Sequence, residues 1–263
     1  MIKDGQIRPW VCIDWVIAKQ AHEKLFLISS TNINALVLHS RPYGEGREIV
    51  QFLTETMGKF AGVRRLSKRG GFQRLQPFTL GHVRVSGRSS LMNVSYFDYV
   101  KKYDFAGERL AVGFYVLELI QKLLAEGEPD PGIYQSTIKA LEWLSTTDQI
   151  EKCLRIFEME LLASLGYEVD FGSEGASGER ISESGCYQFA PDQGFYKVKP
   201  NSERGISGKD LLPVNAGIEN LGEPTLKILK VINRKIIDSL LSGRELTSRK
   251  LLIKQNSSSN ETR

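Results

Sequence analysis

The sequence predicts an α+β protein of several parts, in which a small closed β-barrel is followed by a mainly α-helical domain. Three observations support this class. Short runs rich in branched apolar residues recur roughly every ten residues between residues 33 and 100. From Phe105 onward the apolar residues follow helical spacing instead. The sign of the net charge also changes near this point of the chain.

The composition excludes several classes of protein. With 263 residues, 41% of them apolar and 25% charged, the chain has the length of about two globular domains. No run of about 18 apolar residues occurs, so we expect neither a membrane-spanning helix nor a membrane partner. The three cysteines, Cys12, Cys153 and Cys186, are widely separated. This spacing excludes a disulfide framework and a CxxC metal site, and it fits a reducing compartment.

Residues 1–30 do not resemble the start of a domain. The apolar stretch from Trp10 to Ala18 is interrupted by Asp14, and it lacks the continuous apolar run and the cleavage site of a secretory signal. We expect a weakly ordered N-terminal extension. An extra helix, an amphipathic anchor and a leader translated from an upstream start are the alternatives.

Residues 31–103 are expected to form the barrel domain. The segment from Pro42 to Gly46 and the Met57-Gly58 step provide turns between strands. Strands are predicted over residues 33–40, 47–53, 59–66, 76–86 and 90–100. Five short strands at this spacing are typical of a small closed sheet. One such architecture is the oligonucleotide-binding barrel, or OB-fold.

Residues 104–254 are expected to form the helical domain. Residues 105–126 are apolar around most of the helix circumference, which predicts a helix buried on several sides. The next helix should begin at Pro131 and reach about Ser145. Asp148 and Glu151 predict a capping box for a third helix, which Gly166 should end.

The remainder of this domain contains less regular sequence. Residues 172–185 are rich in Gly, Ser and Glu and predict a loop, followed by a β-hairpin over 187–198, so that a loop and hairpin are inserted near 170–200. A last helix is predicted over 224–241, with Leu229, Ile232, Ile236 and Leu240 facing inward. The polar residues 255–263 are expected to be a disordered tail.

No motif indicates catalysis, so we do not expect an enzyme, a cofactor or a bound metal. The chain contains neither a GxxxxGK[ST] phosphate loop nor an HExxH motif. Gly172, Gly175 and Gly178 have a superficially suitable spacing for a dinucleotide, but no apolar helix opens after them. Glu158 and Glu160 lie two residues apart on a predicted helix and point to different faces, so we expect them to be solvated.

The strongest functional signal is a concentration of positive charge in the barrel. Residues 57–103 hold ten Lys and Arg against one Asp, whereas residues 104–193 hold six against 17 Asp and Glu. Five cations surround a predicted loop at 67–75, and a cationic loop can follow an irregular phosphate chain. We therefore predict nucleic-acid binding that weakens steeply with salt. The cations between residues 57 and 97, where no acid occurs, are Lys59, Arg64, Arg65, Lys68, Arg69, Arg74, Arg84 and Arg88.

Aromatic residues are interspersed among these cations. Two roles are open for them: filling the barrel core, which we favour, and stacking on the bases of a single strand. The rings are Phe60, Phe72, Phe78, Tyr96 and Phe97. A second basic face is predicted near the C-terminus, either as an extension of the nucleic-acid track or as a solvated helix face. It comprises Lys227, Lys230, Arg234, Arg249, Lys250 and Lys254.

Several segments resemble RecO, a family of bacterial recombination mediators and DNA repair proteins. Residues 35–43 (ALVLHSRPY) resemble its opening strand, and residues 75–79 (LQPFT) resemble a motif of its barrel. Residues 154–167 contain LR, FE, LL and LGY in the order found in the segment that closes the family's helical core. Weaker matches lie at 52–58, 86–88 and 115–119. The resemblance covers about residues 33–254.

The resemblance implies an N-terminal OB-fold, a helical C-terminal domain and action without catalytic turnover. It implies binding to single- and double-stranded DNA and annealing of complementary strands. It also implies that the protein works with RecR to help RecA displace single-strand-binding protein in the RecF pathway, in the cytoplasm at the nucleoid. Some members of the family hold zinc with four cysteines between the helices. Here only Cys186 lies in that region, which argues against zinc.

The resemblance further implies that the helical domain holds the acidic, Phe-ending tail of single-strand-binding protein. Such a tail requires an apolar pocket and a local cation. Arg155 falls at the family's candidate cation position, within a region that is otherwise net negative. The alternative is that Arg155 pairs with Glu151 or Glu158 of its own helix, an interaction that is weak at a surface.

Two other functions remain open from sequence. The first is a nucleic-acid enzyme with an unrecognised active site, which would give a metal-dependent product. The second is a basic interaction scaffold, which would bind an acidic protein or anionic lipid more tightly than DNA.

Overall fold

The computed structural model describes residues 32–66, 73–87, 90–200, 202–215, 217 and 221–252. The expected N-terminal extension and C-terminal tail lie outside these residues. The described chain forms two compact units. The first contains the residues up to Thr54 together with Phe60–Lys102, and the second contains Glu55–Lys59 together with the residues from Tyr103 onward.

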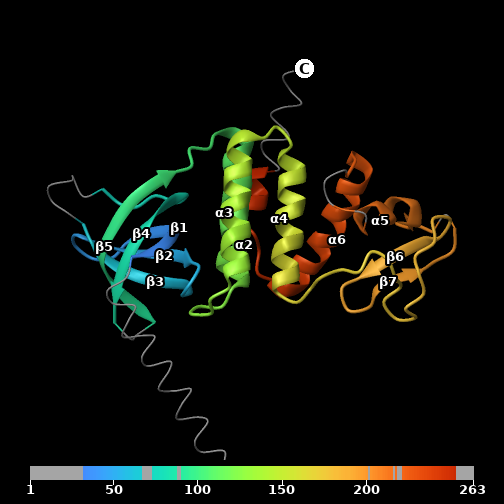
Figure 1. Ribbon diagram of the computed structural model, residues 1–263, viewed down its shortest axis with the longest axis horizontal. Coiled ribbons are helices and arrows are strands. Elements are labelled where there is room, and N and C mark those ends of the chain that lie inside the picture. The colour runs from blue at the N-terminus through green and yellow to red at the C-terminus, as the bar shows by residue number, and fades with distance from the viewer. Residues whose placement is uncertain are drawn as a thin grey trace, which may run out of the picture. The chain divides into compact units, whose positions relative to one another are not determined.

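Five strands form a closed barrel in the order β1-β2-β3-β5-β4 (Figure 1). Strand β1 pairs antiparallel with β2 and with β4, whereas β3 and β5 pair in parallel. All five predicted strands and the OB-fold class are thereby confirmed. The strands are β1 (Ile33–Pro42), β2 (Arg47–Thr54), β3 (Gly58–Arg65), β4 (Thr79–Ser86) and β5 (Leu91–Lys102).

Strand β4 begins at Thr79 and not at Gln76 as predicted. Phe78 has a φ of 66°, in the left-handed region, and its backbone N–H donates to the carbonyl of Val37 at 3.1 Å. The chain therefore turns at Phe78 before the strand can begin. Because left-handed backbone is rare for an aromatic residue, this turn was not predictable from sequence.

The barrel core is built from aliphatic side chains and phenylalanine rings. Phe52 and Phe60 are buried with their ring centroids 5.3 Å apart, and Phe78 is also buried. The Phe97 ring stacks on Phe52 at 6.0 Å and lies over Gly81, where a β-carbon would collide with that ring. Of the five rings named from sequence, Phe60 and Phe78 fill the core and Phe97 is half-buried against it, as favoured there, whereas Tyr96 is exposed.

The second unit is mainly helical. Helix α4 packs against α3 and α6 and also contacts α2, and α6 contacts α5 (Figure 1). The helices are α2 (Gly107–Leu123), α3 (Pro131–Thr146), α4 (Ile150–Ser164), α5 (Gly208–Asn215) and α6 (Glu223–Leu241). A small sheet in the order β7-β6-β8 consists of β6 (Cys186–Ala190), β7 (Gly194–Lys197) and β8 (Ile206–Ser207).

Local sequence signals set several helix ends. Pro131 occupies the first turn of α3, and Asp130 caps it by accepting the Ile133 N–H at 2.9 Å. Gly166 ends α4 at a φ of 82°, with the paired hydrogen bonds of a Schellman motif: Gly166 N–H to Ala163 O and Tyr167 N–H to Leu162 O. These two predictions are confirmed.

The predicted capping box at Asp148 is wrong. Helix α4 begins one residue later, after Gln149, whose side chain makes no capping hydrogen bond to any described residue. The Asp148 carboxylate instead accepts a hydrogen bond from Arg109 of α2 at 2.9 Å. Asp148 therefore bonds to a cation 39 residues away in sequence and does not cap α4.

Two further details differ from the sequence-based prediction. In α6 the last buried position is Leu241, four residues after Ile237, and Leu240 is only half-buried. The hairpin of β6 and β7 is confirmed, but β8 and α5 were not predicted because they are short and α5 contains Pro213. Among the described residues, no helix has the length and apolar character needed to cross a membrane.

Candidate nucleic-acid interface and a cation-lined pocket

Three of the predicted nucleic-acid-binding cations are exposed on the barrel. Arg65 ends β3, Arg74 lies in the segment after it, and Arg84 lies in β4. The Arg84 guanidinium lies 5.7 Å from the ring centroid of Tyr96, its partner in β5, and the Tyr96 side chain is 46% exposed. This places a cation and an aromatic ring together on the outer surface, a pairing suited to phosphate and base.

Arg64 has a different role from the one predicted. Its Nε donates to Glu48 Oε1 at 2.7 Å, and Glu48 is fully buried. Its Nη2 donates to the carbonyl of Gln73 at 2.9 Å, while Glu48 also accepts the Leu75 N–H at 3.3 Å. The basic stretch contains no acid to pair with Arg64, and Glu48 of β2 provides the counter-charge. Glu48 offsets the charge of Arg64. Arg64 is therefore a positioning residue, which holds the segment at 73–75 through the Gln73 carbonyl.

The prediction that Lys59 binds nucleic acid is wrong, because Lys59 is not on the barrel surface. Its side chain is buried, and Nζ donates to the carbonyl of Gln121 in α2 at 2.6 Å. Burial lowers the pKa of this ammonium, and only Glu126 opposes that shift among the principal causes. A buried Nζ that is already bonded cannot contact a phosphate, so Lys59 is not one of the nucleic-acid-binding cations.

Lys68, Arg69 and Arg88, together with Phe72, lie outside the described residues. The structure adds two cations that sequence analysis missed. Arg41 and Arg47 flank the turn between β1 and β2 and are exposed, and the Arg47 guanidinium lies 5.2 Å from the ring centroid of Tyr43. Their signal was hidden because residues 1–56 have equal numbers of acids and bases.

The β1–β2 turn lies beside the segment on either side of residues 67–72. Leu66 N–H donates to Gly46 O at 2.8 Å, and Ser40 Oγ donates to Leu75 O at 2.6 Å. Four exposed cations are thereby brought to one end of the barrel, and we call them the barrel-loop cations: Arg41, Arg47, Arg65 and Arg74. In OB-folds the β1–β2 loop is one of the elements that contact oligonucleotides.

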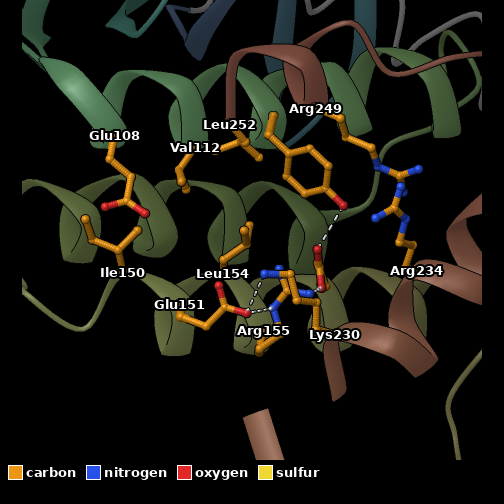
Figure 2. Close-up of a pocket in the computed structure, with 12 residues that line it drawn as sticks. Glu108, Val112, Ile150, Glu151, Leu154, Arg155, Lys230, Arg234, Arg249 and Leu252 are labelled. Atoms are coloured by element: carbon orange, nitrogen blue, oxygen red, sulfur yellow. Dashed lines mark hydrogen bonds and ion pairs between the residues drawn. The ribbon is translucent and has the colours of Figure 1, made fainter. Parts of the chain in front are cut away.

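A second site is a pocket of about 150 Å³ within the helical unit. Figure 2 shows apolar side chains of Val112, Leu154 and Leu252 beside a group of cations. The cations are Arg155 from α4, Lys230 and Arg234 from α6, and Arg249 from a helical turn at 248–252. Three of these were predicted as part of a second basic face. Here they line a pocket with Arg155.

The Glu158 carboxylate lies at this pocket. The prediction that it is solvated is wrong. Its side chain is 1% exposed. One oxygen accepts the Tyr115 hydroxyl at 2.9 Å, and the other accepts Asn233 Nδ2 at 3.1 Å and pairs with Arg155 Nη1 at 2.8 Å. Complete burial raises the pKa of Glu158, although Arg155 and the two hydrogen bonds act in the opposite direction.

Arg155 pairs within its own helix, as the alternative interpretation proposed, but the pairing leaves part of it available. The side chain is 4% exposed and also lies 3.6 Å from Glu151 through Nε. Among the described residues, neither Arg155 Nε nor Arg249 Nη2 has a hydrogen-bond acceptor, although both atoms are buried. Buried donors without acceptors are rare in native proteins, and an anionic ligand in the pocket would supply acceptors for both of these atoms.

Glu118 of α2 fixes the turn that brings Arg249 to the pocket. Its carboxylate accepts the backbone N–H groups of Thr247 at 2.9 Å and Ser248 at 2.8 Å, and the Ser248 hydroxyl at 2.5 Å. Burial favours the neutral acid, but these bonds and the nearby Lys122 outweigh it and lower the pKa of Glu118 to about 2. The ionised carboxylate therefore caps the start of the 248–252 turn.

Two family models match this chain. Residues 28–103 match Recombination protein O N terminal, and residues 105–241 match Recombination protein O C terminal. Together these ranges cover most of the 263 residues. The chain belongs to the RecO family. The resemblance drawn from residues 75–79 and 154–167 is thereby confirmed.

Curated RecO proteins are similar over most of their length. The DNA repair protein RecO of Hahella chejuensis is 34% identical over 225 residues, which cover 83% of this chain and 93% of that protein. The RecO of Laribacter hongkongensis is 33% identical over 226 residues, covering 83% and 92%. The RecO of Haemophilus influenzae is 31% identical over 220 residues, covering 82% and 92%.

The residues present do not offer the four-cysteine zinc site of some RecO proteins. Cys153 is buried in α4 and Cys186 lies in β6, and both are free thiols. In the part of the chain that the structure describes, no group of three or more His, Cys, Asp and Glu side chains is arranged to hold a metal ion.

The lowered pKa of Glu118 predicts how stability depends on pH. Its ordinary value is 4.5, so the ionised carboxylate stabilises the fold fully above that pH, and this contribution is lost as the pH falls toward about 2. Glu118→Gln should lower the free energy of unfolding at pH 7 by about 1–2 kcal/mol, allowing for solvent screening. It should also flatten the loss of stability between pH 4.5 and pH 2. Urea unfolding across this range measures both effects.

The matched control is Glu160→Gln, which removes an acid bonded to the exposed Lys139 and distant in sequence from the 248–252 turn. It should leave the pH dependence close to that of the wild type. Equal slopes for wild type and Glu118→Gln would contradict the capping role.

Proposed function

We propose that this RecO-family protein is a recombination and repair mediator that binds single- and double-stranded DNA and anneals complementary strands without catalytic turnover. The observation that carries the proposal is the gathering of the barrel-loop cations around the β1–β2 turn and the segment at 66–75. Each of these cations is exposed. The β1–β2 loop is among the elements of an OB-fold that contact oligonucleotides in other proteins.

The chemistry of this surface suits strand annealing. Arginine side chains neutralise phosphates with little regard to sequence, and release of counterions supplies much of the affinity. Exposed rings such as Tyr43 and Tyr96, each beside an arginine, can stack on unpaired bases. A surface that offsets phosphate repulsion between two strands while leaving base edges accessible would promote pairing. Neither a nucleotide nor a metal is needed for this step.

We also propose that the pocket of the helical unit binds the acidic, Phe-ending tail of single-strand-binding protein. A cavity of about 150 Å³ is large enough for one aromatic ring. Val112, Leu154 and Leu252 offer apolar walls to that ring. The buried donors of Arg155 and Arg249 would then receive the carboxylate groups of the tail.

These two sites suggest how the protein acts as a mediator. Holding the tail would keep the protein on DNA covered by single-strand-binding protein, while the barrel holds DNA directly. We propose that RecR joins this assembly and that RecA benefits indirectly, at the bacterial nucleoid. The proposal of these two partners rests on membership of the RecO family.

The barrel-loop cations can be tested by charge reversal. A double variant, Arg65→Glu with Arg74→Glu, should weaken single-stranded DNA binding by at least about tenfold at low salt. It should also reduce the slope of log affinity against log salt by about two, because two phosphate contacts are lost. Fluorescence anisotropy with a labelled oligonucleotide at several salt concentrations measures both quantities.

The control for charge is Lys197→Glu with Lys199→Glu, which makes the same charge change at exposed residues of the helical unit. It should have a small effect on DNA binding.

The same variants belong in a strand-annealing assay with and without single-strand-binding protein. Loss of annealing only in the barrel variant supports the proposal, and unchanged DNA binding at low salt overturns it. A metal-dependent cleavage product would favour an enzyme, and tighter binding to acidic protein or anionic lipid would favour a scaffold.

The tail pocket makes a separate prediction. Arg155→Ala should weaken binding of an acidic, Phe-ending peptide without altering DNA binding, but it also leaves the buried Glu158 charge unpaired. Arg234→Ala is therefore the second variant, because its side chain is 60% exposed and its removal leaves the core intact. We expect about a tenfold loss of peptide affinity. Lys227→Ala, an exposed cation of the same helix that does not line the pocket, should have little effect. Unchanged peptide affinity in both arginine variants would refute the assignment.

A further inference from the structure

Three acids line the pocket, Glu108, Glu151 and Glu158, and the comparison of Glu158 with Glu151 suggests a role for Glu151. Glu158 is fully buried and held by three donors, as described above. Glu151 lies in the first turn of α4, and its side chain is 44% exposed. Its Oε1 lies 3.6 Å from Arg155 Nε and 3.4 Å from Lys230 Nζ (Figure 2). One solvent-accessible carboxylate oxygen thus lies between two cations of the pocket.

The contact with Arg155 balances charge without satisfying the donor. A separation of 3.6 Å is too long for a hydrogen bond, and Arg155 Nε is buried with no acceptor among the described residues. A ligand carboxylate that approached to about 2.9 Å would make the bond that Glu151 does not make. Glu151 is free to leave, because nearly half of its side chain already faces solvent.

We propose that Glu151 is a built-in competitor for the pocket, whose carboxylate occupies the anion position between Arg155 and Lys230 until a carboxylate-bearing peptide displaces it. This inference rests on the proposed binding of an acidic tail. It means that the affinity of the tail is set below the value that the cations alone would give.

The competitor also explains how a cationic pocket in a DNA-binding protein can discriminate between anions. A phosphate of the DNA backbone would have to displace Glu151 with no apolar contact to compensate. A peptide that ends in an aromatic residue gains the burial of its ring in the same pocket as well. Specificity of this kind comes from disfavouring the wrong ligand as much as from attracting the right one.

The sign of the effect separates this role from a structural one. Glu151 also lies at the start of α4, where a negative charge stabilises a helix. If stabilising α4 were its whole role, Glu151→Gln would weaken peptide binding or leave it unchanged. As a competitor, Glu151→Gln should tighten binding by roughly threefold to tenfold at low salt, and the gain should shrink as salt screens the partly exposed pair.

The test is a titration of the full chain with an N-terminally labelled acidic peptide ending in Phe with a free α-carboxylate, followed by anisotropy. Glu151→Gln should bind more tightly than the wild type. Glu151→Asp keeps the charge at the start of α4 but withdraws the carboxylate by one methylene, so it should give a smaller gain. Glu160→Gln makes the same charge change on the same helix away from the pocket lining, and it should stay within about twofold of the wild type.

The outcomes distinguish the inference from the function on which it rests. If the wild type binds the peptide and Glu151→Gln binds no more tightly than Glu160→Gln, Glu151 is not a competitor, but the pocket remains a tail site. If neither the wild type nor Glu151→Gln binds, both proposals fail. If Glu151→Gln binds a peptide that the wild type does not, the competitor role is supported. The same peptide with a C-terminal amide should show a smaller gain.

Discussion

Glu158 carries a carboxylate into the interior of the helical unit, where three helices meet around it. Arg155 of the same helix pairs with it, and Tyr115 of α2 and Asn233 of α6 donate to it. An uncompensated buried charge costs several kcal/mol, so the packing of these helices and the placement of these donors depend on one another. The same arrangement holds Arg155 at the pocket. Its Nε is buried there and has no hydrogen-bond acceptor among the described residues.

The uneven charge of the sequence produces two clusters of cations, which we propose as two kinds of anion site. In the barrel, cations remain exposed near loops, which suits a flexible polymer with many phosphates. In the helical unit, the acidic stretch at 104–193 receives Lys230, Arg234 and Arg249 from the basic C-terminal segment. The result is a pocket that combines cations with apolar walls, and we propose that it selects one carboxylate and one ring. Exposed charge favours long polyanions, and enclosed charge favours a single defined end group.

Features that depend on neighbouring residues were predictable, and features that depend on distant partners were not. The strands, the start of α3 at Pro131 and the end of α4 at Gly166 follow from local pattern and backbone preference. The pair of Arg155 with Glu158 was one of two options at helical spacing. In contrast, Lys59 is removed from the surface by Gln121, which lies 62 residues away, and Glu158 is bonded to Asn233, 75 residues away. No pattern within one element contains that information.

The Glu158 carboxylate connects α2, α4 and α6, and this role can be measured by amide hydrogen exchange of the Glu158→Gln variant. Gln has nearly the same shape but no charge, so the buried Arg155 keeps only the partly exposed Glu151, at 3.6 Å, as a counter-charge. Protection should fall in all three helices by an amount equivalent to about 3 kcal/mol, while Glu160→Gln leaves it unchanged. Protection lost from α4 alone, or lost equally in the two variants, would show that this carboxylate does not hold the three helices together.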